Sequence, residues 1–287
     1  INLAGKSVDC RYNKKNKAEI FSSRLESTAM KLSKALGLPA AMLVAAVALQ
    51  ASPLNKDLFL GFNSLAMVLP DALWSCWTIL GDTWMVLAVL ALCLWWQPQA
   101  LLGFALAVPL GGAVSRLTKV MTQMPRPAGS MEASQFHIVG PVLELHSFPS
   151  GHTLSAFALL AVVLAGRRWG VWGWLGLMLA MGVGLSRMAV GAHWPADVLA
   201  GAALGWVCGT FTRAWGDQWL QRQSPERQHR TLQALAWVCL ALCAWAYRVD
   251  TLYPLAREFQ MILASASVLS CAVWLWRGVK CAQWWVN

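Results

Sequence analysis

The sequence predicts an all-α fold, a polytopic membrane helix bundle with a six-span core and two additional C-terminal spans. Of its 287 residues, 57% are hydrophobic and 13% are charged, which is about half the charged share of a soluble domain. The apolar runs are far longer than the roughly 10 residues of a barrel strand, and several approach the 20 that a spanning helix needs. Eighteen tryptophans fit a protein whose aromatic side chains gather at headgroup depth.

The apolar runs predict eight membrane spans, of which the first and the fourth are short. They cover residues 35–52, 73–96, 99–120, 151–166, 169–187, 196–214, 231–248 and 258–276. Residues 54–72 mix apolar and polar side chains, which predicts an interfacial helix on the outer surface. Span 196–214 carries Gly201, Gly205 and Gly209 at four-residue spacing. Such a stripe lets another helix approach closely and makes this span a rigid platform.

These runs divide the chain into four segments. Residues 1–34 are expected to be a basic cytoplasmic tail, and 35–214 the six-span core. Residues 215–230 are polar and are expected to form a solvated cytoplasmic loop, and 231–287 the two-span addition.

The distribution of Lys and Arg predicts the orientation of the spans. With both termini in the cytoplasm, 16 of the 23 basic residues lie on the cytoplasmic side, as the positive-inside rule expects. Alternation of the spans then brings three polar clusters to the outer face. They are Lys119 to Pro127, Pro149 to His152, and Arg187 to Asp197.

The net charge of +10 raises two classes of electrostatic partner, nucleic acids and anionic lipids. The basic residues follow the loops between apolar runs and form no stripe interleaved with aromatic residues, so we expect no nucleic acid partner. Anionic membrane lipids are the expected partner. The eight cysteines form no C-x-x-C pair, and most lie inside apolar runs, where a cysteine acts as a small apolar side chain.

The outer clusters bring cations together with a helix start. A single basic residue at a span end, such as Lys119, would be read as an interface anchor. Arg126 and Arg187 reach the same face, and three converging cations suit a phosphate, which arginine binds with two parallel hydrogen bonds. Ser150 is a favourable N-cap, and Gly151 permits close backbone approach, so this helix start can bind an anion.

The histidines in these clusters supply reactive groups. Asp197 follows His193 by four residues across a helix start, so its carboxylate can accept the Nδ1–H and leave Nε2 as a nucleophile. Asp197 would raise the pKa of His193 and the cations would lower it, so the sequence leaves the direction open. His137 and His146 are the only nearby further ligands for a metal on the His–Asp pair, and we expect no metal there.

Together these residues resemble the type-2 phosphatidic acid phosphatases, a family of lipid phosphate phosphatases that share their active site with vanadium haloperoxidases. The resemblance covers residues 37–214 and excludes the tail and the last two spans. All eleven positions of its three-part signature match in order and spacing. They are Lys119, Arg126 and Pro127; Pro149, Ser150, Gly151 and His152; and Ser186, Arg187, His193 and Asp197.

The resemblance implies a metal-independent reaction with no cofactor. His193 would attack phosphorus to form a phosphohistidine, Asp197 would orient it, and His152 would protonate the leaving oxygen and later activate water. The phosphate would be held by the remaining residues of the signature: Lys119, Arg126, Arg187 and the backbone of Ser150 and Gly151.

We therefore expect an inner-membrane phosphatase acting on a lipid phosphate or diphosphate at the outer, periplasmic face. The favoured substrate is undecaprenyl diphosphate; phosphatidylglycerophosphate, phosphatidate and lipid A phosphate are alternatives. A lipid phosphotransferase would use the same site. An anion transporter is a remote alternative, because the spans are apolar away from the outer face. The sequence leaves the oligomeric state open.

Overall fold

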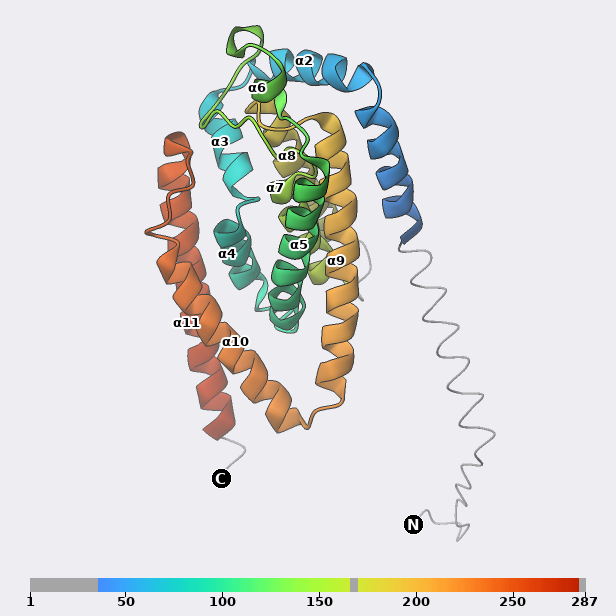
Figure 1. The fold of residues 1–287 in the computed structure, drawn as a ribbon. Coiled ribbons are helices and arrows are strands. Elements are labelled where there is room, and N and C mark those ends of the chain that lie inside the picture. The colour runs from blue at the N-terminus through green and yellow to red at the C-terminus, as the bar shows by residue number, and fades with distance from the viewer. Residues whose placement is uncertain (1–35, 166–169, 284–287) are drawn as a thin grey trace, which may run out of the picture. The chain divides into compact units, whose positions relative to one another are not determined.

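A computed structural model describes residues 36–165 and 170–283 of the chain, with side chains as far as 277 (Figure 1). Every regular element in these ranges is a helix. The predicted tail, residues 1–34, and the connection at 166–169 lie outside the described residues. A helix at Leu36–Gln50 comes first. It is followed by α2 (Leu54–Ala66), α3 (Asp71–Ile79), α4 (Thr83–Cys93), α5 (Ala100–Thr122), α6 (Pro127–Ser130), η1 (Ala133–Gln135), α7 (Gly151–Leu164), α8 (Val171–Ala189), α9 (Pro195–Gln221), α10 (Pro225–Trp245), η2 (Pro254–Ala256) and α11 (Arg257–Gln283).

The all-helical prediction is confirmed for these residues, but the count of eight spans stays a prediction. Among the described residues, three helices are long and apolar enough to cross a membrane, and two bent pairs raise this number to five. The predicted span 73–96 is one of these pairs, α3 and α4, bent by 72°. The bend follows from Asp82, whose carboxylate accepts the N–H of Trp84 at 2.9 Å and so starts a new helix.

The predicted interfacial helix corresponds to α2, which is bent by 96° from the helix before it.

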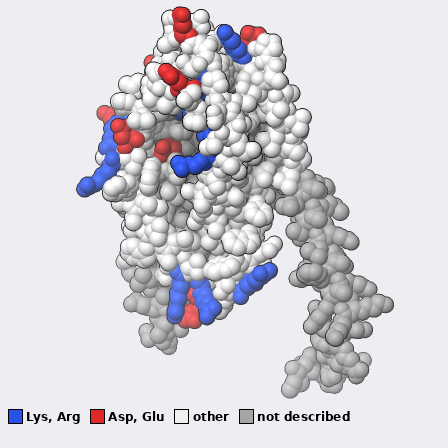
Figure 2. All heavy atoms as spheres, in the orientation of Figure 1, with Lys and Arg blue, Asp and Glu red and all other residues white. Residues whose placement is uncertain are grey.

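On the face shown in Figure 2, charged side chains gather towards the two ends of the described part and around a hollow, and most of the remaining surface is uncharged. This distribution suits a bundle whose middle lies in hydrocarbon.

The glycine stripe of α9 lies directly against the backbone of α7. A Cβ atom at Gly201, Gly205 or Gly209 would come closer than 3.0 Å to a carbonyl oxygen of Ser150, Leu154 or Ala158, respectively. The two helices therefore pack at backbone distance along three turns, as the spacing predicts. This pairing fixes the starts of α7 and α9 beside each other, with the Ser150 amide donating to the carbonyl oxygen of Asp197 at 3.0 Å.

The predicted loop at 215–230 is wrong. Helix α9 continues to Gln221 and α10 begins at Pro225, so three residues connect them. The polar residues continue the helix because Asp217 lies one turn after Arg213 and pairs with its guanidinium at 2.8 Å. Ser224 then caps α10, accepting the N–H of Arg227 at 3.3 Å.

The C-terminal helices are not a separate domain. Residues 39–287 form one compact unit, in which α10 and α11 share a hydrophobic core with α4 and α5. Polar contacts also join the two parts, because the Ser267 hydroxyl of α11 donates to the Ala88 carbonyl of α4 at 2.8 Å. The C-terminal segment therefore supports the helices that carry the polar clusters.

Candidate active site

The three polar clusters meet at one end of the bundle, as alternation of the spans predicts. The Ser147 hydroxyl, just before α7, donates to the carboxylate of Asp197 in the first turn of α9. Arg126, between α5 and α6, donates to the carbonyl of Ala192 at 3.1 Å, in the loop between α8 and α9. Residues up to about 70 positions apart in the sequence are thus joined directly.

His193 and Asp197 form a buried pair. Pro195 opens α9, so His193 lies just before the helix and Asp197 in its first turn. The His193 Nδ1 and Asp197 Oδ2 atoms are 3.2 Å apart, and the two side chains are 2% and 0% exposed. The same carboxylate oxygen accepts the Trp194 N–H at 2.9 Å and the Ser147 hydroxyl. Three donors therefore hold one carboxylate oxygen in place.

The contacts of the imidazole assign its tautomer. The guanidinium Nη1 of Arg126 lies 3.2 Å from His193 Nε2. Arginine can only donate, so Nε2 is the unprotonated acceptor and Nδ1 carries the hydrogen given to Asp197. Nε2 thus carries the lone pair, as a nucleophile requires. In this structure Arg126 contacts that nitrogen directly.

The net effect on the pKa of His193 is a decrease. Burial is the largest cause, and the positive charges of nearby groups lower the pKa further, so that it falls well below its ordinary value. Those groups are Arg126, Arg187, Lys119 and His152. The imidazole is therefore neutral at physiological pH, which keeps the lone pair on Nε2 available.

The three predicted cations are held by different partners. The Lys119 ammonium donates to the carbonyl of His146 at 2.6 Å, and Arg126 Nε donates to that of Leu145 at 2.9 Å. Arg187 is 2% exposed, so it does not reach the interface as a snorkelling residue would. Its Nη1 donates to the hydroxyl of Thr78 and, at 2.9 Å, to that of Tyr253.

The start of α7 supplies backbone donors, although not the pair that was predicted. Ser150 is the N-cap, and its hydroxyl oxygen accepts the Thr153 hydroxyl at 2.9 Å and lies 3.5 Å from the Thr153 N–H. The Ser150 amide is already used by the carbonyl of Asp197. Among the described residues, the amides of Gly151 and His152 have no such partner, so these two are the donors available to an anion.

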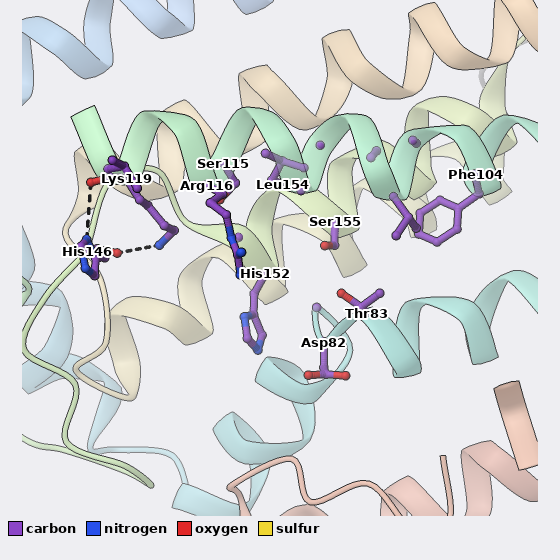
Figure 3. Close-up of a pocket in the computed structure, with 18 residues that line it drawn as sticks. Asp82, Thr83, Phe104, Ser115, Arg116, Lys119, His146, His152, Leu154 and Ser155 are labelled. Atoms are coloured by element: carbon purple, nitrogen blue, oxygen red, sulfur yellow. Dashed lines mark hydrogen bonds between the residues drawn. The ribbon is translucent and has the colours of Figure 1, made fainter. Parts of the chain in front are cut away.

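A cavity of about 600 Å³ adjoins these groups (Figure 3). Lys119, Gly151 and His152 line one part of it, and Figure 3 shows Phe104 at the opposite end from Lys119. Further apolar side chains of α5 and α7 also line it: Ala107, Val108, Leu154 and Ala158. Polar side chains complete the wall, among them Asp82, Thr83, Arg116 and Ser155. The cavity therefore joins cationic groups to an apolar surface.

Comparison with known proteins identifies the segment that carries these residues. The family model described as the PAP2 superfamily matches residues 100–221. The match covers less than half of the chain. This segment holds all eight predicted site residues, and the resemblance seen in the motifs is confirmed.

Two curated relatives match parts of the chain. The chain is 42% identical over 66 residues to the bacitracin transport permease protein BcrC of Bacillus licheniformis, and 36% identical over 108 residues to an undecaprenyl-diphosphatase of Sulfolobus acidocaldarius. The matches cover 23% and 37% of this chain. They span 32% and 48% of the relatives' own lengths.

Two solved structures are similar to more than half of this chain. The crystal structure of LpxE from Aquifex aeolicus is 26% identical, with a TM-score of 0.51 over 56% of this chain and 96% of LpxE. The transmembrane PAP2-type phosphatidylglycerolphosphate phosphatase from Bacillus subtilis is 20% identical, with a TM-score of 0.50 over 67% of this chain and 100% of its own. With the apolar helices, this likeness indicates a multi-pass membrane protein.

Three side chains beside the PAP2 signature were missed by sequence reasoning. Ser147 contacts Asp197, and Thr78 and Tyr253 contact Arg187. Thr78 and Tyr253 lie outside residues 100–221. The predicted alternation of spans places the connection before residue 258 on the outer face, which could have indicated Tyr253. Ser147 lies three residues before Ser150, and no pattern in the sequence indicates its contact with Asp197.

The candidate metal ligands outside the PAP2 signature have other partners. His137 pairs with Asp71 at 2.8 Å, and His146 lies 3.4 Å from the carbonyl oxygen of Lys119.

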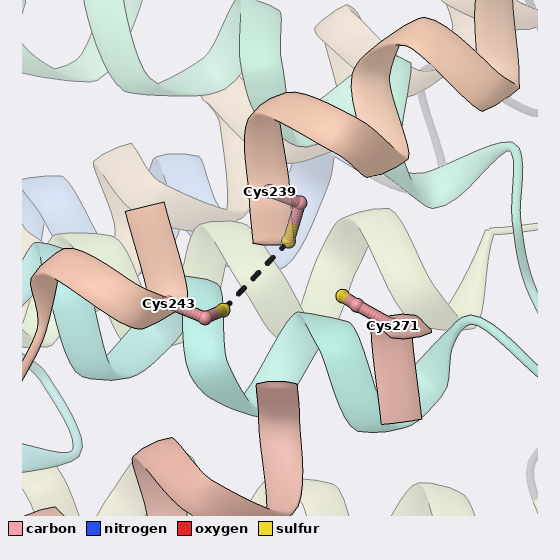
Figure 4. Close-up of side chains that lie close together, drawn as sticks. All are labelled: Cys239, Cys243 and Cys271. Atoms are coloured by element: carbon pink, nitrogen blue, oxygen red, sulfur yellow. Dashed lines mark hydrogen bonds between the residues drawn. The ribbon is translucent and has the colours of Figure 1, made fainter. Parts of the chain in front are cut away.

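Elsewhere, three cysteine sulfurs from α10 and α11 lie within 4.8 Å of one another (Figure 4). They are Cys239, Cys243 and Cys271, all buried. Cys239 contacts Cys243 at 4.0 Å and the carbonyl of Leu87 at 3.9 Å, contacts that a neutral thiol makes as a weak donor.

Proposed function

We propose that this chain is a membrane phosphatase that removes phosphate from a lipid phosphate or diphosphate through a phosphohistidine on His193. The observation that carries this proposal is the buried pair of His193 and Asp197. It presents the unprotonated Nε2 beside the guanidinium of Arg126. A neutral imidazole beside fixed cations is what nucleophilic attack on a phosphate needs.

In the first step, Nε2 of His193 forms a bond to the terminal phosphorus as the bond from that phosphorus to the leaving oxygen breaks. The leaving oxygen is the ester oxygen of a lipid monophosphate or the bridging oxygen of a lipid diphosphate. Protonated His152 gives its proton to the departing oxygen. In the second step, water attacks phosphorus and His152 takes a proton from that water. The bond between phosphorus and Nε2 then breaks, its electron pair returns to Nε2, and inorganic phosphate leaves.

The remaining groups hold the phosphate oxygens. Arg126 already lies beside Nε2, so a bound phosphate would replace that contact and keep the guanidinium on one of its oxygens. Lys119, Arg187 and the amides of Gly151 and His152 at the start of α7 supply the other donors. Three fixed cations provide the charge stabilisation that a metal would otherwise give, so we propose a metal-independent reaction without a cofactor.

The apolar wall of the cavity supports a lipid substrate. Phe104, Val108 and Leu154 line the cavity that also contains Lys119 and His152, so a hydrocarbon chain can lie there with its phosphate at the cationic end. Among lipids we favour undecaprenyl diphosphate, and the curated relative named undecaprenyl-diphosphatase supports this choice.

We further propose an inner-membrane location, with the site on the outer face and both termini in the cytoplasm.

A substrate panel tests this function. We expect the full chain, purified in detergent with a chelator, to release free phosphate from undecaprenyl diphosphate faster than from phosphatidylglycerophosphate, phosphatidate or lipid A phosphate. A water-soluble phosphate ester should react at least about 100-fold more slowly in kcat/KM, because it buries no apolar chain. No release from any lipid, or release only after a divalent metal is added, would contradict the proposal.

A lipid phosphotransferase is the alternative that the same residues serve. In that case the phosphoryl group passes from His193 to a second lipid in place of water. Thin-layer chromatography of labelled products separates the two reactions, because hydrolysis gives inorganic phosphate and transfer gives a second phosphorylated lipid.

The lowered pKa of His193 predicts the pH dependence of the reaction. The imidazole stays neutral above its lowered pKa and loses its lone pair only when the pH falls through that value. We therefore expect the acid limb of kcat/KM below pH ~6.5, the ordinary pKa of histidine. The midpoint pH of this limb should be the same for a lipid monoester and a lipid diphosphate. The two substrates ionise differently, so an equal midpoint assigns the limb to the protein.

The variant Arg126→Gln provides a check on the sign of this effect. Arg126 lowers the pKa of His193, so its removal should move the acid limb to higher pH, whatever it does to the rate. A limb that stays in place, or lies above pH ~6.5 in the unmodified protein, would show that His193 does not titrate as the structure indicates.

A further inference from the structure

Tyr253, from the C-terminal helix pair, contacts the side chain of Arg187. Tyr253 lies between α10 and η2, outside the PAP2 segment, and is 5% exposed. Its hydroxyl accepts the Nη1–H of Arg187 at 2.9 Å. The guanidinium carbon of Arg187 also lies 5.9 Å from the centre of the Tyr253 ring, within the range of a cation–π contact.

Arg187 needs such partners because it is a buried cation. Among the described residues it makes no ion pair, so the hydroxyls of Tyr253 and Thr78 are the side-chain acceptors that its guanidinium contacts. A buried charge without acceptors costs several kcal/mol, and hydroxyl oxygens at hydrogen-bond distance offset part of that cost. Thr78 comes from α3, which also lies outside the PAP2 segment.

The two hydroxyls also decide which edge of the guanidinium is left for phosphate. Both bind the same nitrogen, Nη1. The opposite edge, formed by Nε–H and Nη2–H, is one of the two that can bind phosphate with parallel hydrogen bonds. Nε of Arg187 is buried and has no partner among the described residues.

The ring of Tyr253 also lies against the loop that carries Gly140. Gly140 adopts a positive φ of 80°, and a Cβ atom there would lie 2.7 Å from the Tyr253 ring. The loop that carries Gly140 is tied to the end of α8, because the Val139 amide donates to the Val190 carbonyl at 3.2 Å. Tyr253 is thus in contact with both this loop and Arg187.

We propose that Tyr253 is a positioning residue that directs the Nε edge of Arg187 toward the phosphate. The C-terminal helix pair thereby completes the PAP2 site. This inference rests on the proposed function, in which Arg187 binds the phosphate that His193 attacks. It also gives the additional helices a role in the reaction that the family segment alone does not contain.

The test compares Tyr253→Phe with Tyr247→Phe in the full chain. Both substitutions remove one hydroxyl and keep the ring. Tyr247 belongs to the same C-terminal segment, but its hydroxyl contacts Ser265 at 2.7 Å, away from Arg187. Orthovanadate, which resembles the pentacoordinate state of phosphoryl transfer, is the probe, and its affinity is measured by calorimetry alongside kcat and KM.

We expect Tyr253→Phe to weaken vanadate binding and lower kcat/KM by roughly 10- to 100-fold, the effect of one hydrogen bond to a charged group. Tyr247→Phe should change neither value. Thr78→Val should resemble Tyr253→Phe, and Thr78→Ser, which keeps the hydroxyl, should recover the affinity. This conservative pair keeps the test valid should Tyr253→Phe fold poorly.

The outcomes separate this inference from the proposed function. Equal vanadate affinity in the unmodified protein, Tyr253→Phe and Thr78→Val would overturn the positioning role. A lower unfolding temperature with unchanged affinity and kcat/KM would also overturn it, because Tyr253 would then be only structural. If the unmodified protein releases no phosphate from any lipid but Tyr253→Phe still weakens vanadate binding, the proposed function fails and the positioning role stands.

Discussion

The variant His193→Ala should lose phosphate release almost completely, with a fall of at least roughly 10⁴-fold in kcat. The side chain carries the lone pair that attacks phosphorus, and removing a nucleophile leaves only binding and charge stabilisation. Free phosphate released from the best lipid substrate in detergent measures the effect. The labelled phosphoenzyme, which forms in the unmodified protein and survives alkaline quenching, should be absent from the variant.

His229→Ala is the matched control for this variant. His229 is exposed on α10, far along the chain from the PAP2 signature, so its removal should leave kcat and the unfolding temperature unchanged. Substantial phosphate release by a folded His193→Ala protein would show that another group attacks phosphorus. Activity of that variant restored by a divalent metal would point to a metal-bound water as the nucleophile.

The sequence predicted the parts of the site that follow from local spacing. His193 and Asp197 are four residues apart across a helix start, and Pro195 marks that start, so their contact needs no knowledge of the rest of the chain. Alternation of the spans then brought the three clusters to one end. The glycine stripe on α9 likewise predicted a close helix neighbour, and α7 is that neighbour.

The contacts missed by sequence reasoning depend on packing between distant segments. Tyr253 follows Arg187 by 66 residues and Thr78 precedes it by 109, and neither separation leaves a periodic pattern. The division into a core and a two-span addition stays a prediction, and it does not describe how the two parts pack together. Apolar periodicity shows that α10 and α11 are helices, but it does not show that their apolar faces complete the core of α4 and α5.

The variant Asp197→Asn tests whether the carboxylate contributes through its charge as well as through its geometry. Oδ2 of Asp197 accepts three donors, from Trp194, Ser147 and His193. An asparagine fits with its carbonyl oxygen in that position, because its amide group would otherwise face those donors. Its NH₂ then takes the place of Oδ1, a buried atom with no partner among the described residues. The tautomer of His193 is therefore retained and the negative charge is lost.

We expect kcat for Asp197→Asn to fall by roughly 10²- to 10³-fold, because the positive charge that develops on His193 loses its buried counter-charge. The acid limb of kcat/KM should also move to lower pH, since a carboxylate favours the protonated imidazole. Asp217→Asn is the control on the same helix: its carboxylate pairs with Arg213, so the substitution should lower stability and leave kcat unchanged. If kcat is unchanged in a folded Asp197→Asn protein, Asp197 only orients His193. The asparagine carbonyl oxygen would still provide that contact.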